Sequence, residues 1–150
     1  MASGTVSVHI DRPPDEVFAF VADAENNPRW HSYVVETRWL DDGPMRVGRR
    51  GRQVSRILGL RYEVEAEVEA WDPPTRVVWQ TVAGGAEVRT DCRVGPDGEG
   101  ARMTMIVEGQ FTKGPLRLLG PVAIAVFKRQ ALGDLRRLVS VLEARDEGRL

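Results

Sequence analysis

The C-terminal segment of the chain, residues 115–145, constrains the fold more than any other. From residue 127 onward its apolar residues recur at steps of four or three, which is typical of an amphipathic helix with one buried face. They are Phe127, Ala131, Leu135, Leu138 and Leu142. Nearly everything before residue 113 has the pattern of short strands. A strand-rich chain that ends in one long helix predicts a sheet wrapped around that helix.

The first half of this helix differs from the second. Residues 121–127 are apolar on every side, so the segment is expected either to be buried all round or to cover something apolar. Pro121 suits the first turn of a helix, so residues 115–120 are expected to form a separate short turn or a kinked lead-in. We interpret residues 121–127 as the movable wall of a cavity and residues 135–142 as the anchor that closes the core.

Alternation of apolar and polar residues predicts the strands, and turn residues separate them. The predicted strands span residues 6–10, 33–40, 49–57, 60–70, 75–82, 86–94 and 101–110. After the first of them, Pro13 and Pro14 followed by Asp15 and Glu16 mark the start of a helix. Residues 24–30 predict a second, very short helix.

Residues 49–57 and 60–70 give the most specific local prediction. Arginines on one face of the first strand match glutamates on one face of the second. A turn at Gly59–Leu60 would create the opposed pairs Arg56 with Glu63, Arg52 with Glu67 and Arg50 with Glu69. Each such pair contributes roughly 0.2–1 kcal/mol, and we expect this charged face to meet water. The opposite face is not purely apolar, since it holds Arg49, Gln53 and Ser55 beside Tyr62, Val64 and Ala66.

Composition narrows the class of protein. A chain of 150 residues, 42% hydrophobic and 29% charged, fits one soluble domain over residues 1–150. A net charge of −1 and the glutamates opposite the arginine run argue against nucleic acid as a partner. The lone Cys92 cannot form a disulfide within the chain. One cysteine and two histidines give no pattern for a zinc site, and we expect no metal and no cofactor. The N-terminus lacks a secretory pattern and the longest apolar run is too short to cross a bilayer, so we expect a cytoplasmic protein without stable membrane insertion.

Four stretches carry a family resemblance: residues 10–18, 23–31, 69–79 and 128–142. With them, nearly the whole chain resembles the helix-grip superfamily (SRPBCC) of START domains, plant pollen-allergen proteins and bacterial polyketide cyclase/dehydrase-type proteins. The resemblance implies an α+β fold in which a curved, seven-stranded antiparallel sheet wraps around a long C-terminal helix, with two short helices between strands one and two. It also implies an apolar cavity between the sheet and the helix.

The inward face of the predicted sheet supplies apolar walls and a few polar groups that would orient a ligand. We assign ligand contact to Trp30, Arg49, Gln53, Ser55, Tyr62, Trp79, Thr81, Thr90, Met105, Val126 and Phe127. The alternative is a filled core in which the serine and threonines bond to the backbone. Arg49 has two interpretations: it binds a ligand carboxylate or phenolate through two nitrogens, or it lies at the sheet rim and extends to water.

Candidate catalytic groups are few. His31 follows the second short helix, at the cavity mouth that the resemblance implies, and is a candidate acid/base, as is Tyr62. The sequence identifies no carboxylate partner for His31, since Asp23 and Glu36 are near only along the chain. Cys92 lies in mid-strand among apolar residues, so we expect an inert side chain.

The leading hypothesis from the sequence is a protein that binds or transports a small hydrophobic molecule, such as a lipid, polyketide or aromatic compound, in the cavity. The first alternative is a cyclase or dehydratase-type enzyme, distinguished by a titratable side chain that points inward and has a hydrogen-bonded partner. The second is a protein-interaction or regulatory module, distinguished by a collapsed cavity and an exposed apolar patch over residues 121–126. Monomer and homodimer both remain open.

Overall fold

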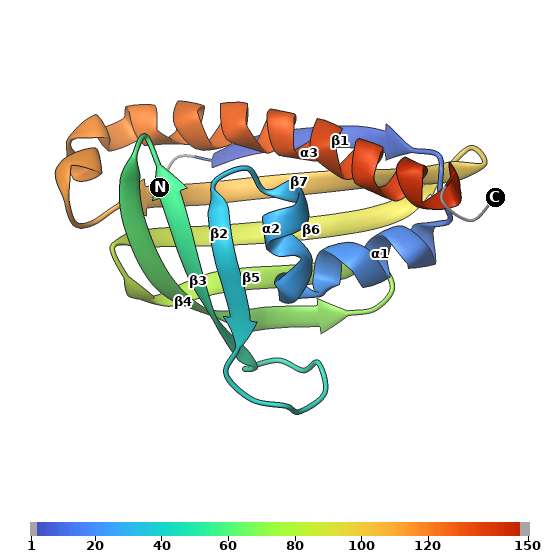
Figure 1. The fold of residues 1–150 in the computed structure, drawn as a ribbon, viewed down its shortest axis with the longest axis horizontal. Coiled ribbons are helices and arrows are strands. Elements are labelled where there is room, and N and C mark those ends of the chain that lie inside the picture. Colours follow the sequence, from blue (N-terminus) through green and yellow to red (C-terminus); the bar gives the residue numbers. More distant parts are fainter. Residues whose placement is uncertain (1–2, 148–150) are drawn as a thin grey trace.

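The protein is described over residues 3–147 by a computed structural model. Seven strands form one antiparallel sheet in the order β1-β7-β6-β5-β4-β3-β2 (Figure 1). Strands β2 to β7 follow one another as a meander, and β1 completes the sheet beside β7. The strands are β1 (Ser3–Ile10), β2 (Val34–Trp39), β3 (Arg50–Ile57), β4 (Leu60–Asp72), β5 (Arg76–Gly84), β6 (Ala86–Asp97) and β7 (Gly100–Phe111).

Short helices connect β1 to β2. The helix α1 (Pro14–Ala22) begins after Pro13 and carries acidic residues in its first turn, where a helix favours negative charge. A turn of 3-10 helix, η1 (Ala24–Asn26), then leads into the very short α2 (Asn27–Trp30). The long α3 (Ala123–Glu147) lies along the sheet (Figure 1). The predicted helix-grip architecture is therefore confirmed.

The buried face of α3 anchors the core. The helix packs against β1 and β7 at one edge of the sheet (Figure 1). Its predicted stripe is almost inaccessible to solvent, because Leu135, Leu138 and Leu142 are at most 1% exposed. Burying one such side chain contributes about 1.5–3 kcal/mol. The leucines thus act as the anchor that the spacing predicts.

A kink separates α3 from the segment before it. The 3-10 segment η2 (Pro115–Val122) precedes α3, and Gly120 within it has a φ of 53° and a ψ of −133° that interrupt the helical backbone. The predicted kinked lead-in is therefore confirmed. The apolar segment 121–127 is not buried on all sides, since Ala123 and Phe127 face the core while Val122 is 59% exposed. An apolar sequence does not by itself bury a helix that lies on the molecular surface.

The β3–β4 hairpin differs from its predicted register by two residues. The turn is Leu58–Gly59, with φ of 51° and 80°, so Arg50 faces Glu67 and Arg56 faces Arg61. A two-residue hairpin of this kind needs positive φ at both central positions, and glycine suits the second of them. A shift of two residues preserves which face each side chain occupies. The charged face therefore stays outward as predicted, with ion pairs from Arg50 to Glu67 (3.2 Å) and from Arg52 to Glu63 (3.0 Å).

Candidate functional site

A cavity of about 120 Å³ lies between the inner face of the sheet, α2 and α3. Most side chains in its wall are apolar, and the polar ones come from the sheet strands β2 to β6, from α2 and from the residues that join α2 to β2. The wall includes these residues of the predicted lining: Trp30, Gln53, Ser55, Tyr62, Trp79, Thr81, Thr90 and Phe127. Ala66 and Cys92 also line it. These residues come together because every second side chain of a strand points to the same face of the sheet.

Three residues of the predicted lining lie elsewhere. Met105 borders a smaller adjoining void of about 20 Å³, together with Asp134 of α3. Val126 is half-buried on α3 outside the cavity wall, because the next residue, Phe127, takes the inward position on the helix. Arg49 is also outside the wall.

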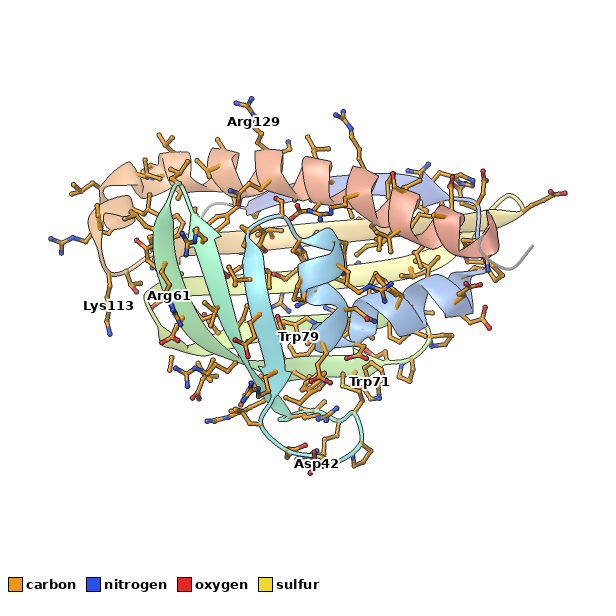
Figure 2. The ribbon with its side chains drawn as sticks, viewed as in Figure 1. Asp42, Arg61, Trp71, Trp79, Lys113 and Arg129 are labelled. Carbon is orange, nitrogen blue, oxygen red and sulfur yellow. The ribbon has the colours of Figure 1, made fainter. Side chains whose placement is uncertain are left out.

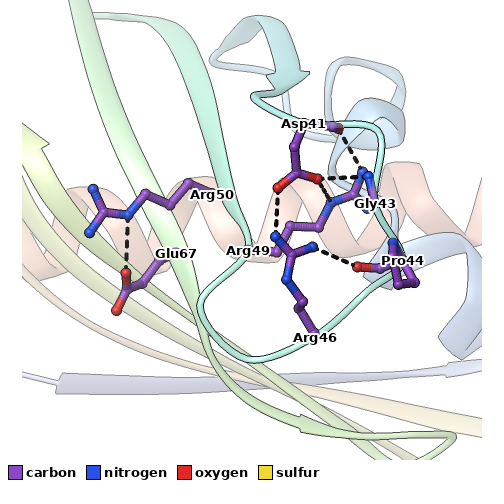
Figure 3. A network of polar contacts seen from close by, with 7 residues as sticks. All are labelled: Asp41, Gly43, Pro44, Arg46, Arg49, Arg50 and Glu67. Carbon is purple, nitrogen blue, oxygen red and sulfur yellow. Dashed lines mark hydrogen bonds and ion pairs between the residues drawn. The ribbon is translucent and has the colours of Figure 1, made fainter.

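Hydrogen bonds to Asp41 hold the side chain of Arg49 in place (Figure 3). Its Nε donates to Asp41 Oδ1 and its terminal nitrogen donates to the Asp41 carbonyl oxygen, both at 3.1 Å. Its guanidinium carbon lies 3.8 Å from the centre of the Trp39 ring. Arg49 is outside the cavity wall, which contradicts the ligand interpretation. It directly precedes β3, at the end of a strand as the rim interpretation has it, but with only 10% of its side chain exposed it does not extend to water. Its partner Asp41 lies in the irregular loop of residues 40–49. The alternation that predicts strands does not predict the course of such a loop.

The same contacts connect to the cavity wall through Trp39 and Trp79. Arg46 donates to the other oxygen of Asp41 at 2.8 Å (Figure 3), and this bond, with a backbone bond from Gly43, lowers the pKa of Asp41 to about 2. Trp39, covered by Arg49, lies 5.3 Å from Trp79 between ring centres, and Trp79 forms part of the cavity wall. The stack backs that wall with aromatic and cationic groups in favourable contact.

Tyr62 links the cavity to the start of η2. Its hydroxyl donates to the Lys113 carbonyl oxygen at 3.3 Å. Its ring lies 5.4 Å from that of Phe111, which stacks on Phe127 of α3 at 5.0 Å. The hydroxyl is thus occupied by the backbone, and the observed contacts give Tyr62 a structural position in the wall.

His31 has the buried carboxylate partner that the sequence did not identify. Its Nδ1 lies 3.0 Å from Asp134 Oδ2, and the Ser32 amide and hydroxyl both donate to Asp134 Oδ1 at 2.9 Å. His31 is 8% exposed and Asp134 is 1% exposed. The ring of Trp30 lies 3.6 Å from that of His31 and restricts its orientation.

The hydrogen bonds define the tautomer of His31. An ionised Asp134 only accepts hydrogen bonds, so His31 Nδ1 carries a proton and Nε2 is left as an acceptor. Within residues 3–147, Nε2 has no hydrogen-bond partner, and His31 lines the cavity. A carboxylate bonded to Nδ1 fixes the orientation of the ring and leaves the Nε2 lone pair free to accept. The arrangement is therefore able to accept a proton from a molecule in the cavity.

The apolar pattern of α3 contains a signal that identifies Asp134 as a buried carboxylate. Asp134 is three residues after Ala131 and four before Leu138, so it lies in the buried stripe of α3. A carboxylate in such a stripe requires a buried partner. The spacing alone gives no partner, because His31 is 103 positions away in the chain.

Two further titratable side chains in the wall are Cys92, which is buried, and Tyr33, which is half-buried. Burial and the Asp91 carboxylate raise the pKa of the Cys92 thiol to about 12, which disfavours a thiolate. Burial and the Asp134 carboxylate also raise the pKa of Tyr33. Among the described residues, no group of three or more histidine, cysteine or acidic side chains could hold a metal ion.

A curved antiparallel sheet around a long helix, with a cavity between them, defines the helix-grip class of proteins. The chain belongs to the family described as polyketide cyclase / dehydrase and lipid transport, which matches residues 1–143. An uncharacterised protein of Mycobacterium tuberculosis is 27% identical over 141 residues, covering 91% of this chain and 93% of its own. An uncharacterised protein of Mycobacterium bovis is 29% identical over 138 residues, covering 83% of this chain and 76% of its own.

Solved structures share the fold at low sequence identity. A protein of Thermus thermophilus has a TM-score of 0.80 at 20% identity, covering 95% of this chain and 99% of its own. An aromatase/cyclase of Streptomyces has a TM-score of 0.78 at 15% identity, with coverages of 96% and 94%. A START superfamily protein of Mycobacterium smegmatis has a TM-score of 0.68 at 18% identity and covers 99% of both chains. In the described part of this chain, no helix is long and apolar enough to span a membrane.

Proposed function

We propose that the protein binds or transports a small hydrophobic molecule, such as a lipid, a polyketide or an aromatic compound, in the cavity between sheet and helix. The cavity itself carries this proposal, because protein interiors are normally packed without voids of this size. Family and fold support ligand binding or polyketide cyclase-like chemistry in general terms. The ligand would gain about 25 cal/mol for each Å² of apolar surface removed from water.

Polar groups of the wall would orient the ligand. Gln53 accepts a hydrogen bond from Asn27 at 3.2 Å and donates one to Ser55 at 3.3 Å. These bonds hold the Gln53 amide in a fixed position at the cavity wall. Access would be between residues 24–33 and the start of α3, where short segments meet and no strand ladder has to open.

A cavity-blocking variant tests ligand binding. Ala66 lines the cavity and Glu65, its neighbour on β4, has its side chain on the other face of the strand. In a thermal-shift screen of fatty acids and aromatic polyketides, we expect ligands to raise the melting temperature of the wild type and of Glu65→Trp but not of Ala66→Trp. If no compound raises the melting temperature, or if Ala66→Trp responds as the wild type does, the proposal is wrong.

A second candidate function is a cyclase or dehydratase-type enzyme in the same cavity, and the His31–Asp134 pair favours it. Nε2 of His31 would take a proton from an acidic C–H or O–H group of the bound molecule, and Asp134 would stabilise the imidazolium that forms. Positioned proton transfer of this kind accelerates reactions about 10²–10⁴-fold. The cavity is not collapsed, which disfavours the protein-interaction module as the main function.

Turnover and binding separate the two candidates. With a poly-β-ketone analogue as substrate, His31→Asn is expected to lower kcat by about 10²-fold or more. The thermal shift that the same analogue produces should remain if the variant still binds it. Equal kcat in His31→Asn and the wild type would exclude His31 as the base, whereas absent turnover in the wild type would leave binding as the function.

A further inference from the structure

The surface around η2 and the first turns of α3 has an unusual composition. We call residues 113–129 the basic-apolar segment. Every residue in it is apolar, glycine or a cation, and none is a neutral polar or acidic residue. Its exposed residues include Leu118, which is 82% exposed, and Val122, which is 59% exposed. Large apolar side chains exposed this strongly within one short segment are typical of an interaction surface.

The charges of the basic-apolar segment are all positive and unpaired. Its cations are Lys113, Arg117, Lys128 and Arg129, and all are exposed. No acidic residue occurs between Glu108 and Asp134. None of the four cations forms an ion pair with a side chain of residues 3–144, whereas arginines on the sheet, such as Arg89 with Glu69, are paired. The free cations are therefore available to an anionic partner.

The segment presents these groups along one end and one side of the molecule. Figure 2 shows Lys113 at the end where η2 lies, with Arg61 near it, and Arg129 on the outer side of α3, away from the sheet. The hydrogen bond from Tyr62 to the Lys113 carbonyl oxygen confirms that the start of β4, which holds Arg61, lies close to residue 113. On α3, Ala125, Arg129 and Leu132 lie opposite the buried Phe127 by helical spacing. Exposed apolar and basic side chains thus occur together at this end of the molecule and along the outer side of α3.

We infer that the basic-apolar segment docks the protein on an anionic lipid bilayer. Exposed Leu118 and Val122 would enter the boundary between headgroups and acyl chains, and the four cations would contact lipid phosphates, as in helices that lie in the membrane interface. An anionic bilayer supplies an apolar layer and dense negative charge together, which matches both properties of the segment. The contact is peripheral, consistent with the lack of a membrane-spanning helix in residues 3–147.

This inference goes beyond ligand binding and does not depend on it. Docking would nevertheless place the bilayer beside the cavity, because Phe127 belongs to the basic-apolar segment and lines the cavity wall. The Tyr62 bond and the Phe111–Phe127 stack connect the docked end to that wall. A protein docked in this way would exchange an apolar ligand with lipid without carrying it through water.

Vesicle sedimentation with the full chain, without added ligand, tests the inference. We expect the wild type to bind vesicles of phosphatidylcholine mixed equally with phosphatidylglycerol, to bind phosphatidylcholine alone at least about tenfold more weakly, and to lose binding in high salt. The double variant Arg117→Glu/Lys128→Glu should lose at least about tenfold in affinity for the anionic vesicles. Leu118→Asp should weaken binding in the same direction.

Matched controls lie at other exposed sites. Val47→Asp changes a residue that is 61% exposed in the loop between β2 and β3, and Arg38→Glu reverses a β2 charge whose side chain is 73% exposed. Both should bind vesicles as the wild type does, and circular dichroism should show every variant folded. Absence of binding to anionic vesicles, or equal losses in the control variants, overturns the inference. A dimer that Leu118→Asp dissociates, in a protein that ignores vesicles, would assign the surface to a second copy of the chain instead.

Discussion

Within residues 3–144, Asp91 and Asp134 are the carboxylates that lie almost wholly out of water, at 2% and 1% exposure. Asp91 of β6 is held by two arginines, with bonds of 2.9 Å from Arg76 and 3.1 Å from Arg93 to its Oδ2. Asp134 is held by Ser32 and His31 beside the cavity. The first charge is neutralised by permanent cations and serves stability, whereas the second orients a group that can change its protonation.

Asp91 is expected to make stability depend on pH in acid. Burial opposes its charge, but the hydrogen bonds from Arg76 and Arg93 outweigh burial and lower its pKa to about 2 from the usual 3.8. A pKa lowered in the folded state stabilises the protein at pH values above that of the unfolded chain, and the contribution is lost as the pH falls from about 4 to 2. The difference corresponds to about 2 kcal/mol.

Urea unfolding at a series of pH values checks this expectation. Asp91→Asn should reduce the free energy of unfolding at neutral pH by about 2 kcal/mol or more, since it also leaves two arginines without their partner. In this variant, the free energy of unfolding should also fall less steeply as the pH is lowered from about 4 to 2. Asp42→Asn, in the exposed 40–49 loop, is the control. An Asp91→Asn protein whose stability declines with pH as steeply as the control would contradict the assignment.

Partners of single residues were the least predictable part of the site. The sequence indicated His31 as a candidate acid/base and most of the cavity lining, because strand alternation determines which side chains face inward. It missed the bond to Asp134, which joins α2 to α3 across most of the chain. It also misplaced Arg49, whose partner Asp41 is positioned by an irregular loop. Such contacts depend on how elements meet, and a local pattern has no information on that.

At the level of elements, glycines have opposite roles on either side of the start of α3. Gly120 has a φ of 53° that L-residues with side chains rarely adopt, and it lets η2 turn away from the helix axis. Gly133 lies inside α3, and a Cβ added there would meet no atom within 4 Å. One glycine is thus required by the backbone, and the other only weakens a helix.

These two positions make a matched pair of substitutions. Gly120→Ala should lower the free energy of unfolding by about 1 kcal/mol or more, because alanine is strained at that conformation. Gly133→Ala should raise it by about 1 kcal/mol, because alanine favours a helix. Chemical denaturation of both variants measures the difference. If both substitutions raise the free energy of unfolding, the positive φ at position 120 does not require glycine.

The β3–β4 hairpin illustrates a limit of prediction for elements. Charge matching identified the two strands and their outward face, and both are correct. The pairing was displaced by two residues because the charge pattern repeats every two residues, so registers that differ by two satisfy it almost equally well. The positive φ of Leu58 and Gly59 is a property of the turn, and it selects one of them.

At the level of the whole molecule, sheet and helix form one unit around the cavity. The buried cluster contains residues of the sheet, of α1 and α2, and of α3. The interior therefore has no internal boundary at which part of it could unfold alone. One domain over residues 1–150 stays a prediction, and the next experiment tests it.

We expect equilibrium unfolding to be a single transition. Trp30, Trp39, Trp71 and Trp79 lie on α2, β2, β4 and β5, so tryptophan fluorescence reports on much of the structure. Its urea midpoint should coincide with that of far-ultraviolet circular dichroism, as in two-state domains. A ligand in the cavity at about 100 times its Kd should raise the free energy of unfolding by about 2.7 kcal/mol and move both midpoints together. Separate midpoints without ligand would show that the domain is not one cooperative unit.

The sequence by itself determined the order and type of the elements, the inward and outward faces of the strands, and the anchor stripe of α3, because each depends on residues close together in the chain. The tertiary structure alone decided the hairpin register, the pairing of Arg49 with Asp41, and the burial of Asp134 against His31. It also decided that the apolar segment 121–127 buries one face and exposes the other. These features depend on distances between elements that are remote in sequence, and only the packing of the sheet around the helix sets those distances.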